Sequence, residues 1–400
     1  MSAGDGIVTS AEALSGQLTE WRRHLHEHPE LSFQEHETTD FLERTLRGFG
    51  VDPVRKTETG LWFDIEGPRS GRTVLVRADI DALPIEEEAD VPYRSGRPGV
   101  MHACGHDGHT AIALGVTKLL LERRGEIAGR VRVLFQPAEE KLPGGAPMMI
   151  RAGVLEGVDE AIGLHLMPMR LWAPGGVFPV GRAALIDGPA MAAAEEFRIR
   201  IRGVGGHGAA PHTAVDAIAC ATQVVNALQH IVSRQVDPLQ PAVVTVGTFH
   251  AGYNFNVIAP QAELTGTVRA FDESVRDRME ESLRRIVRQT ADAFGATADI
   301  EYIRGYPPLV NAAEQAEVVR GVIRDLYGTD ALEAAVPMMG AEDFAYILQE
   351  RPGAFLWLGC GSEELKAAYA NHHPKFAIDE RALPIGAAVL TAAALRLLER

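Results

Sequence analysis

The sequence predicts an α/β fold in which a central mixed sheet is flanked by helices and interrupted by a smaller α+β domain. Before Arg182, apolar segments of strand length alternate with segments of helical periodicity. After it the pattern changes to strands of alternating polarity and long amphipathic helices, and the first pattern returns after residue 304. We therefore expect one domain from residues 1–185 and 304–400, and an inserted domain at 186–303.

Composition and charge restrict the class of protein. With 400 residues, of which 46% are hydrophobic and 23% charged, the chain is typical of a soluble globular protein. The net charge of -15 and the lack of a basic block argue against nucleic-acid binding. No apolar stretch reaches the ~18 residues of a membrane span, and the N-terminus lacks a signal-peptide pattern. The 3 cysteines are widely separated and form no disulfide framework, so we expect a cytoplasmic protein.

Hydrophobic periodicity and turn residues place the elements of the first domain. In order, we expect helices within 10–49, strands at 61–66 and 73–78, a helix at 110–121, a strand at 130–135, a short helix at 148–152 and a strand at 160–165. Pro29 should end the first helix, and the histidines just before it are expected to form a polar helix end rather than a metal site.

The inserted segment has its own order of elements. We expect strands at 195–203, 242–249, 261–271 and 297–304, and helices at 213–234 and 274–294, which gives the order βαββαβ. The glycine-rich segment 203–212 lacks Gly-Lys-Ser/Thr and contains a histidine, so we do not interpret it as a phosphate loop. The exposed face and edge strand of this domain are candidates for dimer formation. Beyond it we expect helices at 312–327 and 384–398 and a strand at 354–359.

Residues 101–109 combine three histidines, one cysteine and one aspartate within nine residues. Thiolate and imidazole suit zinc and other late divalent metals. Alone, such a segment could also be a polar turn that caps the helix after it. The strands nearby favour a site, because they end on acidic residues or histidine: 79–81 after one strand, 139–140 after the next and His165 after a third. The carboxyl ends of strands in an α/β sheet commonly carry the functional groups.

The candidate ligands are of mixed nitrogen, oxygen and sulfur type, namely Cys104, His106, Glu140, His165 and one of His372 or His373. Five exceed the three protein ligands that a catalytic zinc needs, and they suit two divalent ions that share a ligand and a water molecule. Such a water needs a base, for which Glu139 beside Glu140 is a candidate. Asp81 would hold a metal ligand in place without binding the metal itself.

Nine segments together resemble the M20 metallopeptidase and amidohydrolase family, in particular the branch of hippurate hydrolases, auxin-conjugate amidohydrolases and N-acyl-amino-acid deacetylases. They lie at residues 22–30, 77–85, 101–110, 136–140, 163–165, 205–212, 266–269, 340–344 and 372–376. The resemblance covers nearly the whole chain.

The resemblance implies a role for each matching residue. Cys104 would bridge two metal ions, and the further ligands would be His106, Glu140, His165 and His372, the last chosen over His373 by its distance from the proline. Glu139 would act as general base and then as general acid toward the leaving amine. His207 would support the oxyanion, often in the partner subunit's site. Asn256, Arg269 and Gly340 would contact the substrate.

Arg269 has support of its own, because a fixed guanidinium suits bidentate binding of a carboxylate. The alternative is an exposed strand arginine in a surface ion pair. The activity implied is hydrolysis of the amide bond of a small N-acyl amino acid, with two divalent ions (zinc, manganese, cobalt or nickel) and a homodimer formed through the inserted domain. The runner-up is a dipeptidase or carboxypeptidase. A metal-dependent binding protein and a cysteine hydrolase using Cys104 are alternatives of other classes.

Overall fold

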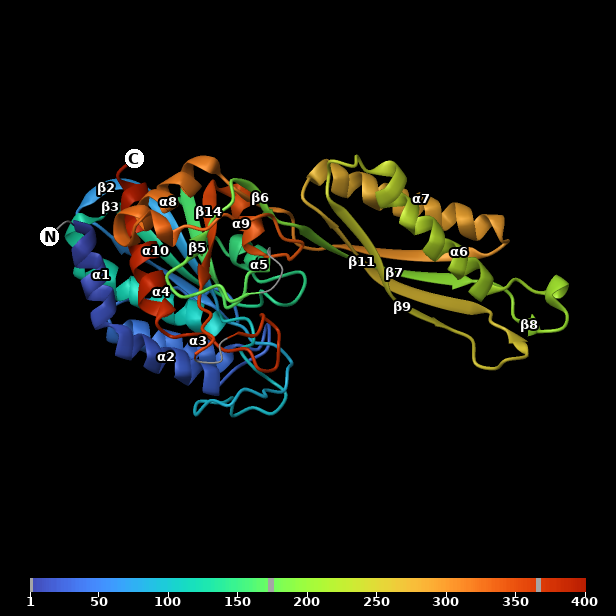
Figure 1. Ribbon diagram of the computed structural model, residues 1–400, viewed down its shortest axis with the longest axis horizontal. Coiled ribbons are helices and arrows are strands. Elements are labelled where there is room, and N and C mark those ends of the chain that lie inside the picture. The colour runs from blue at the N-terminus through green and yellow to red at the C-terminus, as the bar shows by residue number, and fades with distance from the viewer. Residues whose placement is uncertain (1–2, 172–175, 365–367) are drawn as a thin grey trace. The chain divides into compact units, whose positions relative to one another are not determined.

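The computed structural model describes residues 3–171, 176–364 and 368–400 (Figure 1). The chain forms two compact units. The first comprises Met1–Ala190, Val310–Pro337 and Asp343–Arg400, and the second comprises Met191–Leu309 and Met338–Glu342. The short return of the chain at Met338–Glu342 was not expected from the sequence. It belongs with the second unit because the carbonyls of Met338 and Gly340 accept the N–H of Ala192 at 3.1 and 2.9 Å.

Three helices begin the first unit: α1 (Ala3–Ala13), α2 (Ser15–Glu27) and α3 (His36–Gly48). The end of α2 just before Pro29 agrees with the prediction, since proline removes a backbone donor and clashes with the preceding turn. Helix α1 starts before the predicted periodicity. It forms because Ile7 and Ala11 are buried against the first unit's core.

The sheet of the first unit has six strands in the order β1-β3-β2-β4-β14-β5. Their bounds are Leu61–Glu66 (β1), Arg69–Asp79 (β2), Ala128–Gln136 (β3), Glu160–Met167 (β4), Ala183–Ala184 (β5) and Gly353–Gly359 (β14). The four central strands run parallel, and β1 and β5 pair antiparallel at the edges. This mixed sheet confirms the predicted fold class. It also brings the carboxyl ends of β2, β3 and β4 to one edge.

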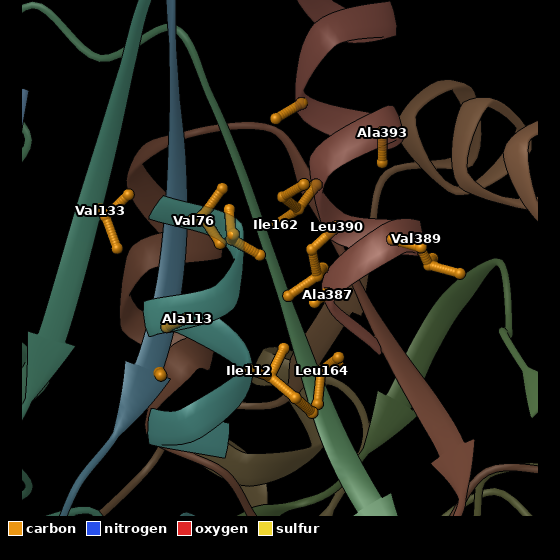
Figure 2. Close-up of a cluster of buried hydrophobic side chains, with 14 of the residues drawn as sticks. Val76, Ile112, Ala113, Val133, Ile162, Leu164, Ala387, Val389, Leu390 and Ala393 are labelled. Atoms are coloured by element: carbon orange, nitrogen blue, oxygen red, sulfur yellow. The ribbon is translucent and has the colours of Figure 1, made fainter. Parts of the chain in front are cut away.

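The core of the first unit lies between this sheet and two apolar helices, α4 (His106–Glu122) and α10 (Ala382–Leu398). Figure 2 shows side chains of β2, β3 and β4 meeting those of α4 and α10, with Val76, Ile162 and Leu390 among them. At Gly108 a Cβ atom would lie 2.5 Å from Leu166, so glycine allows the first turn of α4 to approach β4 closely. The remaining helices are α5 (Ala146–Arg151), α8 (Ala313–Tyr327) and α9 (Phe344–Glu350).

The second unit is a four-stranded antiparallel sheet with two helices on one face (Figure 1). Its strands are β7 (Ala193–Arg202), β9 (Ala242–Ala251), β11 (Gln261–Ala270) and β12 (Thr297–Arg304), in the order β12-β7-β11-β9. The helices are α6 (Ala217–His230) and α7 (Glu273–Ala293). Helix α6 begins later than predicted because the Asp216 carboxylate caps it, accepting the N–H groups of Ile218 and Ala219.

Short strands complete the fold: β6 (Gly188–Met191), β8 (Gly206–His207), β10 (Val257–Ile258) and β13 (Leu309–Asn311). Strands β8 and β10 pair with each other within the second unit. Among the helices of the described ranges, none has the length and apolar character needed to cross a membrane.

Candidate metal centre

The segment before α4 turns sharply enough to point two neighbouring donors in one direction. Gly105 takes a left-handed conformation (φ 93°) that glycine adopts without steric cost. It separates the buried side chains of Cys104 and His106, the latter being the first residue of α4. The helix therefore starts inside the ligand segment, four residues earlier than predicted. The N–H of His372 donates to the Ala103 carbonyl at 2.7 Å, which ties a distant loop to the same segment.

The five side chains predicted as ligands lie together. Donor atoms fall within 4.8 Å of one another in three overlapping sets: Cys104, His106 and His165; Cys104, Glu140 and His372; and His106, Glu139 and Glu140. The Cys104 sulfur is 3.4 Å from His165 Nε2, and Glu140 Oε1 is 3.2 Å from His372 Nε2. Cys104, His106 and Glu140 each belong to two of these sets, so the three sets form one connected cluster of donors.

Hydrogen bonds fix the tautomers of the two buried histidines. His165 Nδ1 donates to the carbonyl of Leu166 at 3.0 Å, and His106 Nδ1 donates to the carbonyl of Asp81 at 2.9 Å. Each arrangement leaves Nε2 as the atom that faces the cluster. Metal-binding histidines are commonly oriented in this way by a partner on the other ring nitrogen.

The cluster combines negatively charged carboxylates with buried donor atoms, as a site for divalent cations requires. His106 Nε2 is buried and has no hydrogen-bond partner in the part of the chain that the structure describes. The buried Glu140 Oε1 lies 3.2 Å from His372 Nε2 and 3.8 Å from His106 Nε2. Burial, followed by the nearby Glu140 and Glu139, holds the pKa of the Cys104 thiol well above its usual range. A thiolate here therefore needs positive charge beside it, which a bound cation supplies. The donor set fits such ions.

Glu139 stands at the edge of this cluster. It follows β3, is 7% exposed, and shares a set of close donor atoms with His106 and Glu140. The residue before it, Ala138, has a positive φ of 55°. The backbone therefore turns abruptly between the strand and the two glutamates.

A second layer of buried groups lies behind the ligands. His109 Nδ1 donates to Asp79 at 2.6 Å, and His109 Nε2 accepts the N–H of Leu166 at 2.8 Å. His109 thus joins the end of β2 to β4 beside His165. Asp79, His106 and His109 also form a set of donor atoms within 4.8 Å. Because both ring nitrogens of His109 are already hydrogen-bonded, we assign it to support rather than to metal binding.

Comparison with known proteins identifies the family. Residues 75–396 match the sequence model of peptidase family M20/M25/M40. The chain belongs to the M20 peptidase family. The resemblance drawn from the nine segments is thereby confirmed, and the protein is a member of a family of hydrolases that act on amide bonds.

Relatives of this M20 protein cover most of its length. The N-acyl-L-amino acid amidohydrolase of Geobacillus stearothermophilus is 50% identical over 295 residues, 74% of this chain and 78% of the relative. The thermostable carboxypeptidase 1 of Saccharolobus solfataricus is 40% identical over 379 residues, 93% of this chain and 94% of the relative. The structure of the Bacillus subtilis YXEP protein, a dinuclear metal-binding peptidase of this family, matches with a TM-score of 0.83 and 36% identity, covering 97% of this chain and 99% of that chain.

The remaining predicted residues of the M20 protein lie in its second unit. His207 is exposed in β8, where its Nδ1 accepts the N–H of Ala209 at 3.0 Å. Asn256 is exposed, and its carbonyl accepts the N–H of Gly208 at 2.8 Å. Gly340 is exposed in the returning segment.

Arg269 is half-buried in β11 and has no ion pair with any residue of the described ranges. Burial lowers the pKa of its guanidinium, although Glu195 and Glu196 act against this shift. These facts argue against the alternative of an exposed strand arginine in a surface ion pair. A half-buried guanidinium without a carboxylate partner is suited to bind one from a ligand.

Sequence reasoning missed several residues around the M20 metal centre. Asn371 Nδ2 donates to the carbonyl of Cys104 at 3.1 Å, a contact that its place directly before His372 could have suggested. Glu35 accepts the N–H of Ala138 at 2.8 Å, and no local pattern signals that contact across the sequence. Among the described residues, the candidate ligand sets do not include the histidines before Pro29. His26 instead lies between Asp107 and Glu87, at 2.8 and 3.2 Å.

Proposed function

We propose that this protein is a metal-dependent amidohydrolase that cleaves the amide bond of N-acyl amino acids to a carboxylic acid and a free amino acid. The observation that carries the proposal is the buried Glu139 beside Glu140 in a five-donor cluster. A binding protein would need the ligands but not a further carboxylate at the same place. The similarity to an N-acyl-L-amino acid amidohydrolase supports this substrate class.

In the proposed centre, two divalent ions (zinc, manganese, cobalt or nickel) would be held by Cys104, His106, Glu140, His165 and His372. Such ions polarise a scissile carbonyl and acidify a water molecule. Glu139 then accepts the proton of the attacking water and returns it to the leaving amine nitrogen. Asp81 keeps His106 and Glu140 in place through its hydrogen bonds.

We assign substrate binding to the second unit. Arg269 and Asn256 would hold the carboxylate of the amino acid, and Gly340 would contact the substrate. His207 would donate a hydrogen bond to the developing oxyanion. We also propose a homodimer through this unit, because strand β9 lies at the edge of its sheet and is largely exposed. The three cysteines are buried and free, which supports a reducing, cytoplasmic location.

The decisive experiment combines a substrate panel with one substitution. The metal-loaded enzyme is assayed on N-acetyl and N-benzoyl amino acids, and Glu139→Gln should lower kcat by about 10²–10⁴-fold with unchanged metal content. Glu58→Gln, at an exposed glutamate, is the matched control. Full activity of Glu139→Gln would show that this mechanism is wrong. Removal of metal by a chelator should abolish turnover, and re-addition should restore it.

The alternative activity, a dipeptidase or carboxypeptidase, is favoured by the similarity to a thermostable carboxypeptidase. Assays on free dipeptides and on N-acyl amino acids with the same C-terminal residue distinguish the two activities. The dipeptides carry a free α-amine on the acyl side of the scissile amide bond, and the N-acyl amino acids do not. Cleavage of the dipeptides alone would replace our proposal with the alternative.

A further inference from the structure

The turn that carries Glu139 has an unusual backbone. Ala138 has a φ of 55°, in the left-handed region that residues with a Cβ atom rarely occupy. Such a conformation is strained and persists only where the surroundings enforce it. Ala138 is fully buried, so water does not satisfy its backbone groups. The direction of the Glu139 side chain depends on this single conformation, because Glu139 is the next residue.

Hydrogen bonds enforce the conformation from several sides. The carbonyl of Ala138 accepts the N–H of Gly145 at 2.9 Å, and the N–H of Glu140 donates to Asp81 Oδ2 at 3.0 Å. The N–H of Ala138 donates to Glu35 Oε1 at 2.8 Å. Two of these contacts involve side chains, those of Asp81 and Glu35. Asp81 also contacts the candidate ligand His106, whereas the hydrogen bond from Glu35 is made to Ala138.

The burial of the Glu35 carboxyl group that makes this contact is energetically unfavourable. Its side chain is fully buried, and its Oε2 has no hydrogen-bond partner in the described ranges. Burial, followed by the negative charge of Asp81, raises the pKa of its carboxyl group to about 7. A buried carboxyl group near another acid destabilises a fold, and an apolar side chain of similar size would avoid that penalty. A positional task at the turn explains why a side chain with a hydrogen-bond acceptor, and not an apolar one, stands here.

We propose that Glu35 is a positioning residue for Glu139: its Oε1 holds the N–H of Ala138, fixes the left-handed turn and thereby aims the base. The inference rests on the proposed function, in which Glu139 is the base. Glu35 itself takes no proton from the substrate or the water. What matters is the acceptor oxygen, and its charge is not needed.

The experiment separates the acceptor from the charge. Glu35→Leu removes both, and Glu35→Gln keeps an acceptor oxygen on a side chain of the same length. In the metal-loaded enzyme, Glu35→Leu should lower kcat by about 10–100-fold with KM and metal content unchanged, because a small displacement of a catalytic group has effects of this size. Glu35→Gln should stay within about threefold of the wild type.

Glu30→Leu is the matched control. Glu30 is also buried and also accepts a backbone N–H, but its donor is Thr38 in helix α3, at 2.8 Å. This variant should lose stability and keep its kcat. Normal kcat in Glu35→Leu, an equal loss in Glu35→Gln, or a loss that follows metal content would each overturn the inference. Glu139→Gln, assayed in parallel, tests the base itself: if that variant is inactive while Glu35→Leu is normal, only the positioning role fails.

Discussion

The carboxylate of Asp81 accepts the backbone N–H of Glu140 at 3.0 Å. The same oxygen accepts the hydroxyl of Ser32 at 2.7 Å, and the other oxygen lies 3.2 Å from His106 Nδ1. One buried side chain at the end of β2 therefore contacts two candidate ligands that belong to different elements. Burial raises the pKa of Asp81, but the hydrogen bonds and the charge of His106 outweigh it, and the pKa is lowered.

Asp81→Ala should weaken metal binding by about 10–100-fold, because partners of metal ligands have effects of this size. Without the carboxylate, the His106 ring and the Glu140 backbone lose their shared support. Competition with a chromogenic chelator measures the affinity. Asp64→Ala removes an ion pair with Arg132 in the same sheet and should leave metal affinity unchanged. Wild-type affinity in Asp81→Ala would contradict the supporting role.

A buried ion pair ties helix α2 to the ligand segment. Arg22 Nε lies 2.8 Å from Asp107 Oδ2, and both side chains are almost completely buried. Burial opposes the charge of Asp107, but Arg22 and then His26 hold its pKa far below the ordinary range. Arg22→Met should lower the free energy of unfolding by about 3–5 kcal/mol, because it breaks a buried ion pair and leaves Asp107 with His26 as its remaining cationic neighbour. Urea unfolding measures the change, and Arg22→Met with Asp107→Asn should recover part of it.

Much of the centre could be predicted because its residues are adjacent in the sequence. Cys104 and His106 lie in one short segment, and Glu139 and Glu140 directly follow a strand that hydrophobic alternation reveals. Parallel strands then bring such segments to one edge of the sheet.

The supporting contacts could not be predicted, because they join positions that no local pattern relates. Glu35 precedes a helix, where an acid indicates only a helix start, yet its carboxylate reaches Ala138, 103 residues away. The segment Met338–Glu342 likewise gives no signal that it packs with the second unit. Both depend on tertiary packing, which periodicity does not encode.

Arg269→Ala should raise KM for N-acyl amino acids by about 10–100-fold, since a charge-assisted hydrogen-bonded pair is lost. The wild type should also prefer a free carboxylate over the corresponding carboxamide, and the variant should lose that preference. Steady-state kinetics on the acid and amide forms measures both effects. Arg200→Ala is the control, because Arg200 already pairs with Glu263 at 2.8 Å. A retained preference in Arg269→Ala would show that the carboxylate binds elsewhere.

Glu35 should also make stability depend on pH. Burial and then Asp81 raise the pKa of Glu35 from 4.5 to about 7 in the folded protein. Between these values the folded state keeps a proton that the unfolded chain has lost, so the free energy of unfolding falls as pH rises through this range. Glu35→Gln has no such titration. When the pH is raised from about 5 to about 8, its free energy of unfolding relative to that of the wild type should therefore increase by on the order of 2 kcal/mol. Urea unfolding of both proteins in EDTA at the two pH values measures the gain. An equal stability difference at both would show that the Glu35 carboxyl group titrates normally, because only a raised pKa produces the change.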